Sequence, residues 1–184
     1  VSFNQAARDK LGRRKSKVTS WYLDLTMIER YWGEDRAYHH TAPISMNYGL
    51  HAALSEVERE GLEARFLRHE LNHRALVAGL EVLGVPLASQ EGHRLWMLNS
   101  VKIPEGVNDG AIRKRLLLDF NIEIGGGLGP LAGKTWRIGL MGESSRKENV
   151  FALVEALGRI LKEDGADVPV DDAASAIERV YAGS

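Results

Sequence analysis

The chain has 184 residues, of which 44% are hydrophobic and 27% are charged, enough to bury a core and to form one or two domains. Its formal net charge of −1 gives no overall field that would attract nucleic acid or an anionic membrane. It has no cysteine, which excludes disulfides and thiolate sites, and no apolar run approaches the roughly 20 residues that span a bilayer, so we expect no membrane partner.

The first 60 residues are predicted to be mostly helix and loop. Asn4 is a suitable N-cap for a first helix, and the spacing of apolar residues predicts a second helix over 21–32. The chain before Pro43 should be extended or looped, because a proline disfavours helix in the residue that precedes it. A third helix is expected over 45–60. No sheet is evident here, so we expect this part to pack on strands that the chain does not include.

Residues 61–184 are predicted to form a small α+β domain that is complete in itself. Its first element is a long helix over 62–83. A capping box at Ser145–Glu148 is expected to start another helix. The other elements expected from the pattern are a strand over 94–103, a helix over 108–120, strands over 122–124 and 134–140, and a last helix over 171–181.

The sequence His69-Glu70-Leu71-Asn72-His73 matches H-E-x-x-H, in which two histidines on one helix face hold Zn²⁺ and the glutamate activates water. A third ligand is needed, but the longer form of the motif requires a histidine where this chain has Gly79. We therefore predict no metal site. A metal-binding module that uses this helix remains an alternative.

The segment Gly127–Thr135 nearly matches a phosphate-binding P-loop. The first glycine of that motif would fall at Leu128, and the pattern after Lys134 predicts a strand instead of the helix whose N-terminus would bind phosphate. We therefore predict no nucleotide site here.

Three segments together resemble one family, the class V, fold-type I pyridoxal-phosphate aminotransferases of the alanine–glyoxylate and serine–pyruvate group. The segments are SWYLDL at 20–25, YHHTAPISMNYGL at 38–50 and IEIGGGLGPLAGKTWRIGLMGESSRKENV at 122–150. The resemblance runs in order and matches the carboxy-terminal half of the family. It implies an α/β fold in which 1–60 is the tail of the large cofactor-binding domain and 61–184 is the small α+β domain.

The Y-H-H-T motif of the family falls on Tyr38, His39, His40 and Thr41. The resemblance implies that Tyr38 and Thr41 reach the phosphate of pyridoxal 5'-phosphate bound to the other subunit of a homodimer. Hydroxyl groups suit this task, because a phosphate needs hydrogen-bond donors.

The R-I-G-L motif of the family falls on Arg137-Ile138-Gly139-Leu140, and its arginine implies a substrate-binding role for Arg137. A guanidinium presents a planar, two-pronged set of donors to a carboxylate and stays charged at any working pH. Because side chains alternate along a strand, Arg137 can face a cleft while Trp136 and Ile138 are buried.

In the family, the lysine that forms the Schiff base with the cofactor lies upstream of the point where this chain begins. We therefore expect no catalytic residue in the chain, and an amino-terminal half, separate or missing, as its partner. Completed in this way, the protein is expected to be a cytoplasmic aminotransferase that moves an amino group from alanine or serine to glyoxylate or pyruvate. The alternative to this enzyme is an inactive dimerising fragment.

Overall fold

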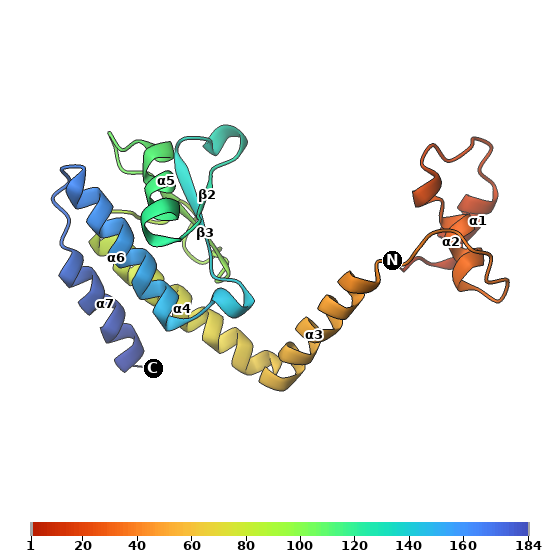
Figure 1. Ribbon diagram of the computed structural model, residues 1–184, viewed down its shortest axis with the longest axis horizontal. Coiled ribbons are helices and arrows are strands. Elements are labelled where there is room, and N and C mark those ends of the chain that lie inside the picture. The colour runs from red at the N-terminus through yellow and green to blue at the C-terminus, as the bar shows by residue number, and fades with distance from the viewer. Residues whose placement is uncertain (1, 184) are drawn as a thin grey trace. The chain divides into compact units, whose positions relative to one another are not determined.

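The structure is a computed structural model that describes residues 2–183 (Figure 1). The chain divides between Ser55 and Glu56 into two compact units, and each is considered by itself. This division falls within helix α3 (Ile44–Glu60), a few residues before the predicted boundary at residue 60.

The first unit consists of short helices joined by loops. Its elements are α1 (Gln5–Gly12), the 3-10 turn η1 (Trp21–Leu23), α2 (Leu25–Trp32) and the first part of α3. The prediction for Asn4 is confirmed, because its side chain accepts a hydrogen bond from the Ala7 amide at 3.0 Å. Between residues 2 and 55 the chain forms no strand, as predicted, and of these residues only His39 is buried.

The prediction of one helix over 21–32 is wrong in one respect, because the helix is interrupted at Asp24. This residue is extended, with φ −75° and ψ 98°, and its carboxylate accepts hydrogen bonds from the amide and hydroxyl of Thr26 at 3.0 and 2.6 Å. Such a side-chain cap starts a new helix at the next residue. The result is a 3-10 turn followed by α2.

The second unit combines helices with a small antiparallel sheet that lies beside them (Figure 1). The sheet has three strands in the order β1-β3-β2. Helix α7 packs on α4 and α6, and α5 packs on α6. The elements are α4 (Leu62–Val82), β1 (Leu98–Lys102), α5 (Asp109–Phe120), β2 (Gly125–Gly126), the 3-10 turn η2 (Gly129–Leu131), β3 (Thr135–Gly139), the 3-10 turn η3 (Gly142–Ser144), α6 (Lys147–Glu163) and α7 (Val170–Ala182).

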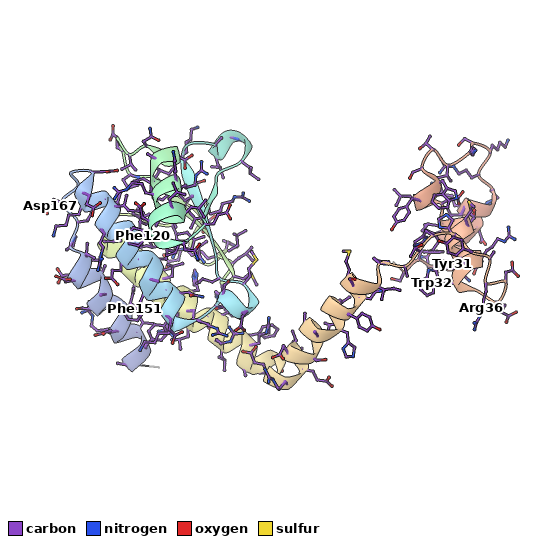
Figure 2. The ribbon with its side chains drawn as sticks, viewed as in Figure 1. Tyr31, Trp32, Arg36, Phe120, Phe151 and Asp167 are labelled. Carbon is purple, nitrogen blue, oxygen red and sulfur yellow. The ribbon has the colours of Figure 1, made fainter. Side chains whose placement is uncertain are left out.

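The core of this unit is apolar and contributed by every long element. Side chains with no exposed surface come from α4, the sheet, α5, α6 and α7, and include Leu76, Val101, Ile112, Trp136, Leu157, Ile160 and Ile177. Figure 2 labels Phe120 on α5 and Phe151 on α6, two partly buried rings packed against this core. Within residues 2–183 no helix is both long and apolar enough to cross a bilayer.

Two strand predictions need correction. The strand expected over 122–124 lies instead at β2, because the chain before it still caps α5: Asn121 is left-handed, with φ 56°, and the Ile122 amide donates to the Leu116 carbonyl at 2.9 Å. The strand expected over 94–103 is shorter and begins at Leu98.

The capping box predicted at Ser145 is also wrong. Helix α6 begins at Lys147, and Arg146 at its N-cap supplies no side-chain hydrogen bond. The hydroxyl of Ser145 instead accepts a hydrogen bond from the amide of Asn72 at 3.1 Å, so a residue distant in sequence takes the group that the local pattern assigned to the helix.

Candidate functional site

Tyr38 and Thr41, the predicted phosphate-binding residues, lie close together in the first unit. Their hydroxyl oxygens are 2.8 Å apart, and the side chain of Tyr38 is 73% exposed. The main-chain N–H groups of 38–41 donate to no main-chain carbonyl of residues 2–183. The segment thus presents hydroxyl and amide donors on one short loop, which is the donor set that a phosphate requires.

His39 anchors this loop to the 3-10 turn η1. Its buried ring donates through Nε2 to the Trp21 carbonyl at 3.0 Å and packs against the Trp21 ring at a tilt of 33°, with centroids 4.2 Å apart. The other ring nitrogen, Nδ1, lies 2.7 Å from Nδ1 of His40, within hydrogen-bond distance. The motif therefore places the exposed hydroxyl groups of Tyr38 and Thr41 on either side of two histidines that are buried or partly buried.

Aromatic rings of α2 support the same loop. Tyr31 lies 5.8 Å from the Tyr38 ring and 5.6 Å from the His40 ring, between centroids, in tilted or edge-on contacts. Figure 2 shows Tyr31 beside Trp32 at the end of α2. These contacts hold Tyr38 against its own unit and leave its hydroxyl at the surface.

Arg137, the predicted substrate-binding residue, lies on β3 in the second unit. Trp136 and Ile138 on either side of it are buried, whereas Arg137 is partly exposed on the other face, so the predicted alternation is confirmed. Its Nε donates to the Gly126 carbonyl at 2.8 Å. No carboxylate within residues 2–183 pairs with it, which leaves its two Nη groups available for an anionic ligand.

The residues opposite Arg137 on the neighbouring strands are small. Ser100 of β1 and Gly125 of β2 both pair with Arg137, so all three side-chain positions share one face of the sheet. The hydroxyl of Ser100 is buried and has no hydrogen-bond partner among the described residues. The sequence analysis did not single out Ser100, because only the strand register places it beside Arg137.

The face of the sheet opposite to Arg137 carries a polar cluster whose members bond to one another. Asp109 accepts from Arg113 at 2.7 and 3.2 Å and from the indole N–H of Trp136 at 2.9 Å. The hydrogen bond from Arg113 lowers the pKa of Asp109 below its usual range, so this carboxylate stays charged. The cluster fixes Trp136, and with it the segment of β3 that carries Arg137.

The two histidines of the H-E-x-x-H sequence serve the fold. His69 donates through Nδ1 to the Arg65 carbonyl at 2.7 Å and accepts through Nε2 from the Gly142 amide at 3.1 Å, so both of its nitrogens are occupied. His73 donates to Asn99 at 2.6 Å, and burial lowers its pKa. Among the described residues, no three potential metal ligands come together.

The same side of α4 holds the loop that follows β3. Arg68 donates to the carbonyls of Gly142 and Ser145 at 2.9 and 2.6 Å, and Asn72 donates to the Ser145 carbonyl at 2.9 Å. Tyr181 donates to Asn72 at 2.6 Å, and burial raises the pKa of Tyr181 to about 12. The sequence analysis missed this role of α4, although the polar residues on a buried helix face were a signal of it.

The chain is similar over most of its length to aminotransferases. It is 41% identical over 164 residues to (S)-ureidoglycine–glyoxylate transaminase of Bacillus subtilis, covering 89% of this chain and 39% of the relative. It is 34% identical over 175 residues to alanine–glyoxylate aminotransferase of Drosophila melanogaster, covering 93% of this chain and 44% of the relative. The chain thus spans about two fifths of the length of these curated relatives. No protein-family model matches it.

Solved structures have the same fold. The crystal structure of alanine–glyoxylate aminotransferase from Nostoc sp. matches with a TM-score of 0.80 and 48% identity, covering 87% of this chain and 42% of that one. The chain therefore belongs to the fold-type I pyridoxal-phosphate aminotransferases. Within them it is a member of class V, beside the alanine–glyoxylate and ureidoglycine–glyoxylate enzymes, and the match is consistent with their carboxy-terminal half. The resemblance drawn from the sequence is confirmed.

Proposed function

We propose that the complete protein transfers an amino group from a small amino acid, alanine or serine, to a small keto acid, glyoxylate or pyruvate. The observation that carries the proposal is the likeness, over about nine tenths of the chain, to relatives whose names share glyoxylate as a substrate. In this proposal the chain contributes two binding elements, Arg137 for the substrate and the loop of Tyr38 and Thr41 for the cofactor.

Arg137 binds the α-carboxylate that amino and keto acids have in common. With Nε held by the Gly126 carbonyl, the guanidinium is fixed in one orientation and its Nη groups bind the two carboxylate oxygens. This contact orients the substrate, so that its Cα–H bond can be aligned for proton removal. A bidentate contact of this kind accepts any small 2-amino or 2-keto acid, which suits an enzyme that must bind both partners of the exchange in turn.

Tyr38 and Thr41 would hold the phosphate of pyridoxal 5'-phosphate. Their paired hydroxyls and the unused amides of 38–41 fit that group, because each can donate to a phosphate oxygen. When bound, the cofactor supplies the electron sink of transamination. His39 keeps the loop in place through its bond to the Trp21 carbonyl.

We further propose two partners, an amino-terminal half that carries the cofactor lysine and a second copy of the enzyme. Support comes from apolar side chains of the first unit that are more than half exposed and have no core of their own. Besides Tyr38, they include Trp21, Tyr22, Leu23, Trp32, Ile44, Met46, Tyr48, Leu50 and Leu54. Burying a side chain of this size is worth about 1.5–3 kcal/mol, so the unit needs a covering surface.

The test is a kinetic comparison of the complete protein, loaded with pyridoxal phosphate, with its Arg137→Lys and Arg137→Ala variants. We expect transfer from alanine to glyoxylate, and KM for both substrates about a hundredfold higher in Arg137→Ala, because a charge-assisted bidentate contact of about 3 kcal/mol is lost. The KM values of Arg137→Lys should lie between those of the wild type and Arg137→Ala, since an ammonium keeps the charge but lacks the planar pair of donors.

Arg159→Ala is the matched control, because Arg159 is an exposed arginine of the same unit that pairs with Glu155. It should leave both KM values unchanged. Unchanged KM in the Arg137 variants would refute the role of this residue, and the absence of amino transfer in the loaded protein would refute the proposed activity.

A further inference from the structure

The side chain of Arg137 lies over a glycine on the neighbouring strand β2. Gly125 pairs directly with Arg137 between β2 and β3. A Cβ atom on Gly125 would lie 3.1 Å from Nη2 of Arg137, 3.4 Å from Nε and 3.5 Å from Cζ. The guanidinium thus occupies the space that any other residue at 125 would fill.

The backbone does not require glycine at this position. Gly125 is not among the glycines with positive φ, so an L-residue could adopt its conformation. Gly127 is a different case, because a Cβ atom there would lie 2.1 Å from the Leu131 carbonyl oxygen and would force the loop apart. The glycine at 125 contributes room for the guanidinium and little else.

Position 125 lies next to the Nη atoms of Arg137, which are the atoms proposed to bind the substrate. Nε is already used on the Gly126 carbonyl, so a carboxylate must bind end-on through Nη1 and Nη2. Nη2 is also the atom that a side chain at 125 would touch first. A new Cβ would displace the far end of a flexible side chain and leave the fold intact.

We propose that Gly125 is a positioning residue, whose missing side chain keeps the Nη edge of Arg137 aligned for the carboxylate of a small 2-amino or 2-keto acid. The inference rests on the proposed function, in which Arg137 binds the substrate carboxylate. A side chain at position 125 should therefore raise KM for both substrates, because both present the same carboxylate to Arg137.

The test is Gly125→Ala in the complete protein loaded with pyridoxal phosphate. KM for alanine and for glyoxylate should both rise about tenfold with little change in kcat, because a displacement of a few tenths of an ångström spoils a bidentate contact without removing it. The dissociation constant of propionate, a plain carboxylate, should rise in parallel when measured by calorimetry. Gly125→Ser carries the same Cβ and should repeat the effect.

Gly139→Ala is the matched control, since Gly139 is a strand glycine on the same face of β3 and a Cβ atom there would meet only Met141, at 4.0 Å. It should leave KM and the propionate affinity unchanged. If Gly125→Ala behaves like Gly139→Ala while Arg137→Lys raises KM, the role of Gly125 is refuted and the proposed function stands. If Arg137→Lys also leaves KM unchanged, both are refuted.

Discussion

The pair of hydroxyls at Tyr38 and Thr41 makes a prediction about cofactor retention. Tyr38→Phe or Thr41→Ala in the complete protein should each raise the dissociation constant of pyridoxal phosphate about tenfold, because one hydrogen bond to a charged group contributes about 1.5–3 kcal/mol. The measurement is fluorescence or absorbance titration of the apoenzyme with the cofactor.

Tyr48→Phe is the control, because Tyr48 is an equally exposed tyrosine of the same unit. Mixing two kinds of subunit, one without the Tyr38 hydroxyl and one unable to bind cofactor, also tests whether the contact is made across the dimer. Unchanged affinity in both the Tyr38 and the Thr41 variants would exclude the phosphate role.

The buried hydroxyl of Ser100 makes a prediction about stability. It has no hydrogen-bond partner in the described part of the chain, so its desolvation cost is not offset, and Ser100→Ala removes that cost. The Tm should stay the same or rise. A fall of several degrees would mean that the hydroxyl has a protein partner in the complete enzyme, whereas a rise in KM at unchanged Tm would identify the substrate as its partner.

At β3 the sequence predicted which side chains are buried but not the contacts that hold them. Alternation along the strand correctly predicted a partly exposed Arg137 between two buried neighbours. The bond from its Nε to the Gly126 carbonyl, and the pairing with Ser100, depend on strand register, which no local pattern states.

At the level of elements, the junction of α3 and α4 carries an ion-pair cluster that predicts acid sensitivity. The hydrogen bond from Arg68, followed by that from Arg65, lowers the pKa of Glu60 from its usual 4.5 to about 2. A carboxylate with a lowered pKa in the folded state contributes stability that is fully present above pH 4.5 and is lost as the pH falls towards 2.

Glu60→Gln should therefore lower the Tm at pH 7 and flatten the dependence of Tm on pH between 4.5 and 2. Scanning calorimetry across that range is the measurement. Glu58→Gln is the control, since Glu58 is an exposed glutamate of the same helix. Parallel curves for the wild type and Glu60→Gln would contradict the assignment.

Helices were predicted more accurately than strands, for a physical reason. Apolar periodicity defines α3, α4, α5 and α7 to within two residues, because burial of one face decides a helix locally. The strand misplaced at 122–124 has the right apolar residues, but these complete the cap of α5. The polar side of α4 resembled a metal motif because its true partner, the loop after β3, is about 70 residues away in sequence.

For the whole molecule, the apolar core lies in one of the two units. Every residue of the core cluster falls between Ala75 and Ile177, whereas His39 is the one buried residue among 2–55. We therefore expect amide hydrogen exchange of this 184-residue chain to be slow in α4 and α6 and fast in α1 and α2. Mass spectrometry of exchanged peptides makes the measurement.

The same peptides give the control when the complete enzyme is exchanged. Protection of α1 and α2 should then rise, because the exposed apolar residues of the first unit are covered. Equal protection of this unit in the chain and in the complete enzyme would contradict the proposed amino-terminal partner. The proposed partner also accounts for how little tertiary structure local patterns predicted in the first 60 residues, because we expect these residues to pack on strands that the chain does not include.

The burial of Trp136 has a practical consequence. The other tryptophans, Trp21, Trp32 and Trp96, are exposed by 53%, 70% and 36%, whereas Trp136 has no exposed surface and its indole donates to Asp109. Its emission should be blue-shifted relative to the others and resist aqueous quenchers. Because the next residue along β3 is Arg137, this ring is an intrinsic optical probe of the strand, and we expect the ligand binding proposed at the guanidinium to be measurable through it without a label.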